Sequence, residues 1–354
     1  MSDNPETTRR VEAAQLKAFI KTAYLAAGLP DGDAVTAADV MTKIDLLGGS
    51  GHGVFRLPQY IRRIKAGGIN VTPNIHLEHE TDSTALVNGD NCVGSLAVHR
   101  ATEVAMEKAE KMGVGWAGVK MGNHAGTASV YARMVMEKDM IGIYSAVGSA
   151  NHLPPWGGIE MLLSTNPIAI AVPAMDEPPV VLDMATTVAA YGKVKTAAQR
   201  GEQMPVGWMV DDQGQPLTDP TKSNEGFLVP VGEYKGYGMA LVLGLLAGTL
   251  NGAAMGREVV DFNTDDETVT NTGQFICAIS LKAFGDVDEF KRQVDELART
   301  LRASPTLAGF DSVRLPGENS QGIHDDFTKN GIIVHAELIK ALDTLAQDLD
   351  INPL

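Results

Sequence analysis

Residues 113–129 read GVGWAGVKMGNHAGTAS, and this stretch decides the fold class. Gly113, Gly115 and Gly118 match the GxGxxG fingerprint of Rossmann dinucleotide-binding domains letter for letter. That fingerprint requires the glycines to end a strand and to open a helix whose N-terminus faces the pyrophosphate. Here an amphipathic helix, predicted over residues 96–112, precedes the glycines, and a β-rich run overlaps them. The order therefore predicts a helix C-cap that leads into a strand, and argues against a Rossmann site.

The elements around this stretch alternate between helices and short strands, which is typical of an α/β protein. Apolar spacing predicts helices at both chain ends and between the strands, and one apolar, glycine-dotted helix that we expect to be buried on several sides. The predicted strands are 114–121, 141–147, 168–172, 180–184 and 274–283, and the predicted helices are 11–27, 34–47, 57–65, 96–112, 128–137, 188–199, 237–250, 289–302 and 332–349.

Composition excludes several classes of protein. The 354 residues carry a formal net charge of −15, which repels a nucleic-acid backbone. Cys92 and Cys277 are the only cysteines, which excludes a disulfide framework and a cysteine zinc site. The apolar stretches are shorter than the ~20 residues that cross a bilayer, and the polar N-terminus shows no signal peptide. We expect a cytoplasmic protein without membrane partners.

His124 lies in MGNHAGTAS, where a predicted strand ends and a predicted helix begins. This is the edge of the sheet at which α/β enzymes usually bind their ligands. The residues after it, Gly126 to Ala128, could present backbone N–H groups to a phosphate at a helix N-terminus. A histidine that only caps the helix explains the same spacing equally well.

His52 and Arg56 lie four residues apart in GHGVFRLPQY. If a helical turn begins after Gly53, both side chains point the same way, and the guanidinium could bind a carboxylate. In an acidic chain, Arg56 and Lys235 are the cations beside glycine-rich loops that could hold an anionic substrate or cofactor. A solvated surface pair is the simpler interpretation.

Two other constellations carry less weight. Ser50 precedes His52 by two residues, but GGSGH is not the GxSxG elbow of a serine hydrolase, so that function remains a remote alternative. His76 and His79 are three apart in a β-prone stretch, where they point to opposite faces and could not share a metal ion. We therefore predict no metal site.

Taken together, nine stretches resemble the type-2 malate/L-lactate dehydrogenase family, which includes malate, sulfolactate and ureidoglycolate dehydrogenases and Δ1-piperideine-2-carboxylate reductases. They occur in family order along nearly the whole chain. The stretches are DLLGGSGHGVFRLPQY, NGDNCVGSLA, GVGWAGVKMGNHAG, PPWGG, STNPIAIAVP, VVLDMATT, EYKGYGMAL, NTGQFICAIS and VRLPGE.

The resemblance implies a nicotinamide enzyme with a non-Rossmann α/β cofactor domain of mixed sheet and a mainly helical domain built from both chain ends. It also implies a homodimer with sites near the subunit interface. The corresponding boundaries are 1–85 and 320–354 for the helical domain, 86–127 and 208–319 for the cofactor domain, and 128–207 for an inserted α/β segment.

The resemblance also assigns residue roles. His124 matches the acid/base histidine, with His52 as its competitor. Arg56 matches the arginine that binds the substrate carboxylate, and Thr165 another substrate-side position. The expected cofactor contacts are His124, Ala125, Gly126, Thr127, Ala128, Asp183, Met184, Ala185, Lys235, Pro316, Gly317 and Glu318.

Two positions depart from the family pattern. Many relatives have serine where this chain has Gly51, and some reductases have an aspartate at the position of Lys193. Both departures weaken His52 as the proton donor, so we expect His124 to transfer the proton. The expected reaction is hydride transfer between nicotinamide and a small 2-hydroxy or 2-oxo acid of the malate, lactate or sulfolactate kind. A cyclic imine reductase and a catalytically silent nicotinamide-binding protein are the alternatives. Since most dehydrogenases of the family use NAD, we expect NAD, with NADP possible.

Overall fold

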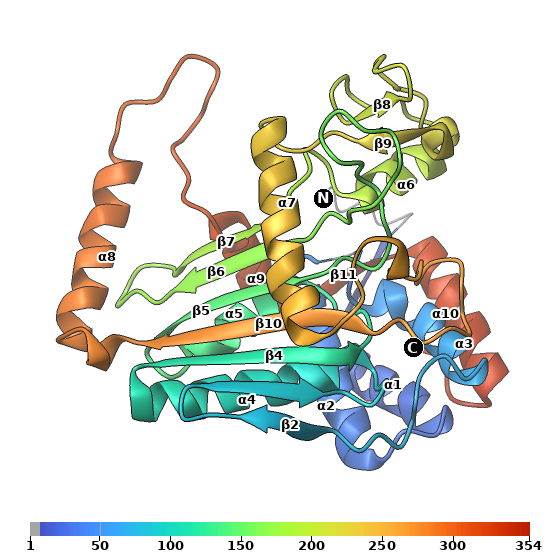
Figure 1. Ribbon diagram of the computed structural model, residues 1–354, viewed down its shortest axis with the longest axis horizontal. Helices are drawn as coiled ribbons and strands as arrows, with labels where there is room; N and C mark the ends of the chain where they lie inside the picture. The colour runs from blue at the N-terminus through green and yellow to red at the C-terminus, as the bar shows by residue number, and fades with distance from the viewer. Residues whose placement is uncertain (1–7, 50) are drawn as a thin grey trace.

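A seven-stranded mixed sheet organises the protein (Figure 1). The computed structural model describes residues 8–49 and 51–354. Of the six strand pairings in this sheet, only β3 with β4 is parallel. From one edge to the other the strands are β2 (His76–Glu80), β3 (Thr84–Asn88), β4 (Val114–Gly122), β10 (Thr272–Ser280), β5 (Met140–Ala146), β6 (Ile168–Val172) and β7 (Val180–Met184).

Helices cover both faces of the sheet. Helices α4 (Gly94–Met112) and α5 (Ala128–Met136) pack on one face, and α7 (Tyr234–Ala247) lies across the other (Figure 1). Helix α4 ends at Gly113, whose positive φ of 84° forms the C-cap before β4 begins. The predicted order of helix, glycine and strand at the GxGxxG match is therefore confirmed. Gly115 allows β4 to approach α4, because a Cβ there would strike the carbonyl oxygen of Ala105.

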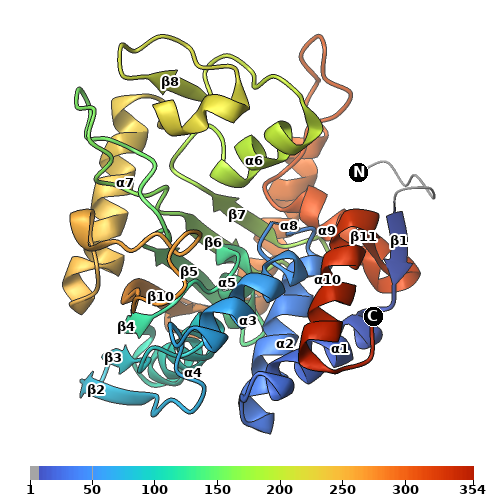
Figure 2. The same ribbon diagram turned by 90° about the vertical axis from the view of Figure 1, so that its right-hand side faces the viewer.

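Both chain ends join in one group of helices beside the sheet (Figure 2). Strand β1 pairs antiparallel with β11, and α10 packs against α1 and α3. One continuous apolar core extends from these helices to the sheet face under α4 and α5. The elements are β1 (Thr8–Val11), α1 (Ala13–Ala26), α2 (Asp31–Leu46), the 3₁₀ turn η1 (Val54–Arg56), α3 (Leu57–Lys65), β11 (Ile332–His335) and α10 (Ala336–Leu349).

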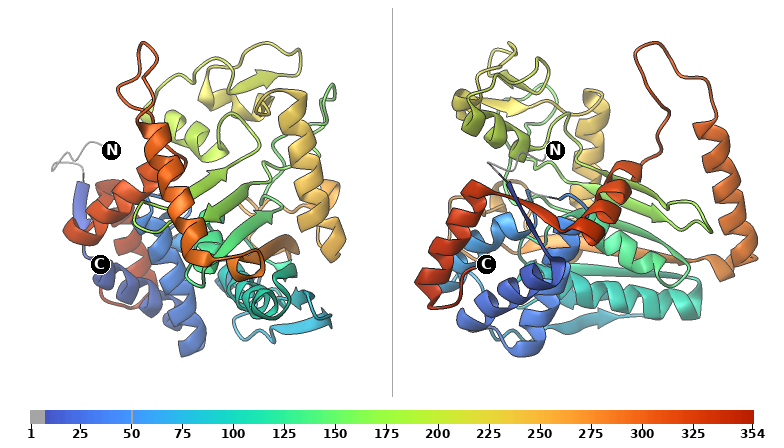
Figure 3. Two further views of the ribbon diagram at one scale, coloured as in Figure 1. Left: turned by 90° about the vertical axis from the view of Figure 1, so that its left-hand side faces the viewer. Right: turned by 180° about the vertical axis from the view of Figure 1, so that it is seen from behind.

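A small lobe sits above the sheet edge in Figure 2. It contains α6 (Tyr191–Arg200), the hairpin strands β8 (Met209–Asp211) and β9 (Gly226–Leu228), and the 3₁₀ turn η2 (Pro220–Glu225), around a small core of its own. At the opposite side, α8 (Val287–Arg302) stands beyond the β6–β7 hairpin, and a long connection returns to α9 (Glu318–Asn330) (Figure 3).

Three predicted elements need correction. Residues 332–335 form β11 rather than the start of the last helix, because their β-branched side chains pair with β1. The helix predicted from residue 188 begins at Tyr191. Helix α7 was expected to be buried on several sides, yet Val242 and Leu245 are 54% and 44% exposed in the single chain. Helix α9 and strands β1, β8 and β9 were not predicted.

The expected domain boundaries at 85/86 and 127/128 fall within the seven-stranded sheet, which contains strands from both sides of each boundary. In the described part of the chain, no helix is both long and apolar enough to cross a membrane. Cys92 and Cys277 are buried free thiols.

Candidate active site

Five strand ends meet at one edge of the sheet, and most of the expected site residues follow or precede them. The register pairs Thr272 with Gly122, Ser145 with Ile168, and Ile168 with Met184. The segments after β4, β5 and β7 and before β10 and β6 therefore share this edge. His124 follows β4 by two residues, which agrees with the predicted position at a strand-to-helix junction.

His52 and His124 are in direct contact at this edge. His52 Nδ1 lies 3.2 Å from His124 Nε2, and their rings stack with centroids 5.4 Å apart. The His124 ring also stacks on Phe262, again at 5.4 Å between centroids. The tight turn at Gly49 to Gly53, closed by backbone hydrogen bonds, carries His52 to this place. Ser50, the serine of the hydrolase alternative, lies outside the described residues.

Tyr60, on α3, holds the other side of the His124 imidazole. Its hydroxyl lies 2.6 Å from His124 Nδ1 and 2.9 Å from the His124 carbonyl oxygen. The carbonyl can only accept, so the tyrosine proton goes to it and Nδ1–H donates to the tyrosine oxygen. His124 Nε2 then accepts a hydrogen bond from His52 Nδ1–H. His52 Nε2 is the one nitrogen of this pair without a partner among the described residues.

Both histidines are held neutral. Burial, with Arg56 nearby, lowers the pKa of His52 to about 4. Burial, His52 and Arg56 lower the pKa of His124 well below its ordinary value. Both imidazoles are therefore uncharged at neutral pH, and His52 Nε2 is the nitrogen open to a proton, at the energetic cost of charging a group in a poorly hydrated place beside a cation.

Arg56 is at the end of η1, so a helical turn does begin after Gly53 as the prediction required. Its Nε donates to the Gly51 carbonyl at 3.0 Å, and its Nη1 donates to Gln59 Oε1 at 2.7 Å and to Asn263 Oδ1 at 2.9 Å. Arg56 makes no ion pair with a described residue, and its Nη2 has no described partner. Nη2 is thus the nitrogen available for a carboxylate.

Asp45 anchors the loop that carries His52. It is buried on α2, and its Oδ2 accepts the Val54 amide at 2.8 Å. Gly53 is required between them, because a Cβ there would lie 2.0 Å from Asp45 Oδ1. Burial raises the pKa of Asp45 to about 7, although the Val54 amide opposes this shift.

The segment expected to contact cofactor phosphates opens α5. The Gly126 and Thr127 amides form no hydrogen bond within the described chain, and Thr127 Oγ1 is buried without a partner. The Ser129 amide, by contrast, already donates to Asp183 Oδ2 at 3.1 Å. One turn further on, Arg133 is half-buried, and its buried Nε and Nη2 are unpaired within the described chain. The start of α5 therefore offers several unsatisfied donors to an anion.

The expected cofactor contacts at 316–318 lie beside β7, next to Val181, which is two residues before the expected contacts at 183–185. The Val181 amide donates to the Pro316 carbonyl at 2.9 Å, and Gly317, with φ 93°, packs against Val181. Both oxygens of Glu318 are already engaged, with Arg302 at 2.5 Å and with the Leu315 amide at 3.0 Å. Glu318 thus braces the 316–318 loop.

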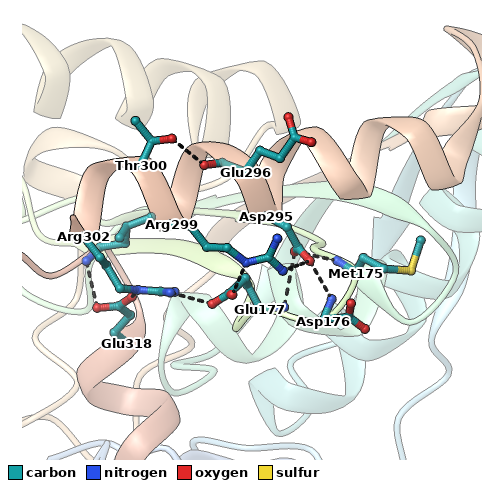
Figure 4. A network of polar contacts seen from close by, with 10 residues as sticks. Met175, Asp176, Glu177, Asp295, Glu296, Arg299, Thr300, Arg302 and Glu318 are labelled. Atoms are coloured by element: carbon teal, nitrogen blue, oxygen red, sulfur yellow. Dashed lines mark hydrogen bonds and ion pairs between the residues drawn. The ribbon is translucent and has the colours of Figure 1, made fainter. Parts of the chain in front are cut away.

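A network on α8 fixes the β6–β7 turn and the start of α9 from outside (Figure 4). Buried Asp295 accepts the amides of Met175 and Asp176, both at 3.0 Å, in the loop between β6 and β7. Arg302 links Glu177 of the same loop to Glu318 at the start of α9. Residues far apart in sequence are thereby locked around the turn that leads into the start of β7.

Thr165 and Lys235 also lie near the end of β7. The Thr165 carbonyl accepts both the amide and the hydroxyl of Thr186, at 3.0 and 2.8 Å. Lys235 is exposed at the start of α7. The Val231 amide, a few residues before this helix, donates to the Thr186 carbonyl. The structure thus brings His52, His124 and Arg56 into one cluster and groups Thr165, Asp183 and Lys235 around β7.

Comparison with known proteins identifies the family of the chain. The sequence profile of the malate/L-lactate dehydrogenase family matches residues 11–343. The chain belongs to the malate/L-lactate dehydrogenase family. The resemblance inferred from the nine stretches is confirmed.

Individual members of this family are similar over almost the whole chain. Malate/(S)-sulfolactate dehydrogenase of Methanothermus fervidus is 37% identical over 92% of this chain and 94% of its own. The solved sulfolactate dehydrogenase of Methanocaldococcus jannaschii superposes with a TM-score of 0.89, at 35% identity over 97% of this chain and 98% of its own. The malate dehydrogenase of Pyrococcus horikoshii OT3 gives a TM-score of 0.89, at 31% identity over 98% and 97%.

Three residues of the cluster were missed by sequence reasoning. Tyr60 is the last residue of the family stretch DLLGGSGHGVFRLPQY, but nothing in the sequence around it indicates a hydrogen bond to His124. Asn263 lies in an unremarkable acidic segment, and its Oδ1 contacts Arg56. Lys195 on α6 reaches the same oxygen at 3.3 Å. The predicted departure, Lys193, lies two residues before it, and both lysines are exposed.

Proposed function

We propose that this protein is a nicotinamide-dependent oxidoreductase that interconverts a small 2-hydroxy acid and its 2-oxo acid. The observation that carries the proposal is the contact of two neutral histidines beside an arginine that lacks a carboxylate partner. A carboxylate needs the cation, and the hydroxyl next to it needs a proton acceptor that is uncharged at neutral pH. The family relationship supports the same reaction class.

The described residues fit a bound dinucleotide. The free amides of Gly126 and Thr127, the unpaired Thr127 hydroxyl and the unpaired Arg133 nitrogens are all suited to phosphate oxygens. Adjacent β-strands lie about 4.8 Å apart, so the edge from β4 to β7 extends over roughly 19 Å, which suits an extended ligand. We propose that residues 124–128, 183–185 and 316–318, with Lys235, hold the cofactor along this edge.

The protein contributes orientation and proton transfer, and the bound nicotinamide supplies hydride chemistry. Arg56 Nη2 holds the substrate carboxylate and so fixes which face of C2 is presented. His52 Nε2 accepts the proton of the substrate hydroxyl. His124, fixed by Tyr60, stabilises the charged His52 through the bond between the rings. The expectation that His124 moves the proton alone thus becomes a proposal that the pair acts as a unit, with His52 facing the substrate.

The cofactor site is proposed to function without a Rossmann domain. A Rossmann domain binds its dinucleotide on parallel strands, and the sheet here has one parallel pairing in six. Because strands from both sides of residue 127 share this sheet, we propose a division that follows the sheet and separates the lobe around α6. NAD is the expected cofactor and NADP the alternative.

We also propose a homodimer, in which the exposed face of α7 is covered by a second copy. Val242, Leu245 and Leu250 on and after α7 are 54%, 44% and 64% exposed, and Ile159 on a neighbouring loop is 67% exposed. An apolar surface of this kind on a protein with a large net charge is typical of a subunit interface. Cytoplasmic location remains a prediction from composition.

The alternatives receive less support. Some cyclic imine reductases of this family have a relay aspartate where this chain has Lys193, which is exposed and forms no hydrogen bond with the described histidines. The serine hydrolase alternative rests on Ser50 and His52 in GGSGH, and this spacing is not the GxSxG elbow of such enzymes.

An oxidation screen tests the proposal. Purified protein is mixed with NADH or NADPH and a panel of 2-oxo acids, including oxaloacetate, pyruvate and sulfopyruvate, and with a cyclic imino acid. We expect loss of reduced-nicotinamide absorbance with at least one 2-oxo acid. Turnover of the imino acid alone supports the reductase, and binding of NADH without any turnover supports a silent binding protein.

A further inference from the structure

Arg63 on α3 is a fully buried cation that forms no ion pair with a described residue. Its exposed fraction is 0%, whereas its neighbour Arg62 is exposed and pairs with Asp266 at 3.4 Å. A buried charge loses its hydration and normally needs a carboxylate or several hydrogen bonds in exchange. Arg63 Nε has no partner in the described chain, so the two terminal nitrogens carry the whole compensation. Both of them bind main-chain carbonyls.

These carbonyls belong to a tight turn in residues 261–268, which we call the site loop. Arg63 Nη1 donates to the Asp265 carbonyl, and Nη2 donates to the Thr268 carbonyl at 2.7 Å. Asp265 closes the turn from within, because its Oδ1 accepts the Thr268 amide at 2.8 Å. Gly68, just after α3, leaves room for the site loop: a Cβ there would lie 2.2 Å from one of its main-chain oxygens and 3.0 Å from Arg63 Nη2. The guanidinium therefore fastens the site loop to the end of α3.

Phe262 carries the site loop into the histidine cluster. Its ring has no exposed surface and stacks on His124, and the Arg63 guanidinium lies 4.8 Å from the centre of the same ring. Tyr60 meets the ring edge at 5.6 Å between centroids, and Gln59 Nε2 donates to the Phe262 carbonyl at 2.6 Å. Arg63 follows Gln59 by four residues and Tyr60 by three, so all three reach Phe262 from one side of α3. Because an aromatic ring attracts a cation, Arg63 holds the site loop by this ring as well as by its carbonyls.

Asn263, the next residue, connects the site loop to Arg56. Asn263 Oδ1 accepts Arg56 Nη1 at 2.9 Å, and Gln59 Oε1 accepts the same nitrogen at 2.7 Å. Asp261 Oδ1 accepts both the Asn263 amide at 2.8 Å and its side-chain Nδ2 at 2.9 Å, which turns the Asn263 oxygen toward the cation. The site loop therefore touches the imidazole pair through Phe262 and the guanidinium of Arg56 through Asn263.

We propose that Arg63 is a positioning residue, which fixes the site loop and, through it, both halves of the proposed active site. This rests on the proposed function, in which His52, His124 and Arg56 act on the substrate. Arg63 acts through the loop alone, since its partners are main-chain carbonyls and the Phe262 ring. Without this cation, the Phe262 ring no longer shields the His124 imidazole from water. Arg56 also loses a fixed partner that keeps it turned toward the substrate carboxylate.

Steady-state kinetics separate a positioning role from a general loss of stability. Values of kcat and KM for the best 2-oxo acid of the screen are compared in the wild type, Arg63→Met, Arg63→Lys and Lys108→Met. Lys108 is a matched control, because it is a buried cation on α4, 6% exposed, that donates to Glu80 and to the Thr81 carbonyl at the β2 edge of the sheet.

The variants should differ in KM. Lys108→Met should lose stability in urea unfolding and keep the wild-type KM, because partial unfolding removes active protein without changing the site that remains. Arg63→Met should raise KM and lower kcat/KM by about 10- to 100-fold, since a displacement of about 1 Å among positioned groups costs factors of this order. Arg63→Lys should lose most of the same activity, because an ammonium cannot stack on a ring and span two carbonyls as the planar guanidinium does.

An NMR titration gives a readout that needs no turnover. The His124 imidazole is followed in the protein without substrate, and its signal is assigned by its loss in His124→Gln. Burial holds the pKa of His124 well below its ordinary value in the wild type. Water that enters beside a loosened Phe262 reduces this burial, so the pKa in Arg63→Met should rise toward about 6.5. Phe262→Leu leaves the buried cation in place and should show the same rise, whereas Lys108→Met should titrate as the wild type does.

Several outcomes overturn the inference and separate it from the proposed function. An equal rise of KM in Lys108→Met and Arg63→Met, or a His124 titration unchanged in both Arg63→Met and Phe262→Leu, contradicts the positioning role and leaves the proposed function intact. Wild-type kinetics in Arg63→Lys contradict the need for a guanidinium. If Arg63→Met does not fold, Arg63→Lys and Phe262→Leu carry the same comparisons. If the wild type reduces no 2-oxo acid with NADH or NADPH, the proposed function fails, and the titration alone decides whether Arg63 holds the site loop on His124.

Discussion

Removing the Tyr60 hydroxyl tests whether His124 depends on a fixed tautomer. In Tyr60→Phe the ring remains, and its edge contact with Phe262 at 5.6 Å between centroids can persist. The variant loses one oxygen that contacts both His124 Nδ1 and the His124 carbonyl. His124 can then place its proton on either nitrogen, and the bond to His52 is no longer enforced.

The expected size follows from these two contacts. A hydrogen bond to a group that becomes charged contributes about 1.5 to 3 kcal/mol, so kcat should fall by about 10- to 100-fold. A buried carbonyl left without a donor costs about 1 to 3 kcal/mol of unfolding free energy. Tyr60→Phe should therefore lose both stability and turnover.

Tyr131→Phe is a matched control. The Tyr131 hydroxyl donates to the carbonyl of Ala125, the residue next to His124, and does not touch the imidazole. In urea unfolding, Tyr131→Phe should lose about as much stability as Tyr60→Phe. Its kcat, measured with the best 2-oxo acid of the screen, should stay within about twofold of wild type. The pH profile of kcat should shift in Tyr60→Phe only. Equal kcat in the two variants, or an unshifted profile in Tyr60→Phe, would refute the role given to Tyr60.

Three further predictions concern charge and assembly. Asp45 has a folded-state pKa of about 7, above its unfolded value, so its stabilising contribution is complete below about pH 4 and is lost as pH rises through 7. In urea unfolding, the free energy of unfolding of the wild type should be about 2 to 3 kcal/mol lower at pH 8 than at pH 5, and Asp45→Asn should largely abolish this difference. An equal difference in both proteins contradicts a proton on buried Asp45. Because the pKa of His52 is about 4, kcat/KM for hydroxy-acid oxidation should stay flat from pH 8 to about 5.5, and a fall centred near 6.5 would show an unperturbed histidine. Val242→Glu should convert the dimer to monomer in sedimentation equilibrium, and a wild type that is already monomeric overturns the α7 interface.

Local patterns predicted much of the sheet. The runs at 168–172 and 180–184 form β6 and β7 with the predicted bounds, since each run is β-branched and ends in turn residues. The pairing of β1 with β11 was not predictable in this way, because it joins residues more than 320 positions apart. The predicted burial of α7 on several sides was wrong for a different reason. An apolar sequence indicates that a helix is shielded from water, but it does not indicate whether the same chain or a second copy shields it.

The candidate site divides along similar lines. Glycines around His52 and His124 marked both histidines as loop residues, which is correct, but their mutual contact depends on how two loops fold over Asp45 and Tyr60. On α6 the sequence drew attention to Lys193, whereas Lys195 contacts Asn263. The phase of a helix relative to a site is set by packing, here by Tyr191 against His152, and spacing alone does not reveal it.

In the proposed mechanism, the electrostatics of the cluster tie proton transfer to substrate binding. Burial and Arg56 together keep His52 and His124 uncharged while the site contains only the protein. A carboxylate bound at Arg56 cancels part of the repulsion that an imidazolium would feel, and so raises the pKa of His52. In this mechanism, His52 therefore becomes basic enough to hold a proton only when the 2-hydroxy acid whose hydroxyl supplies that proton is bound. In a chain with a net charge of −15, this coupling requires cations without carboxylate partners, because an ion pair at Arg56 would raise the histidine pKa permanently.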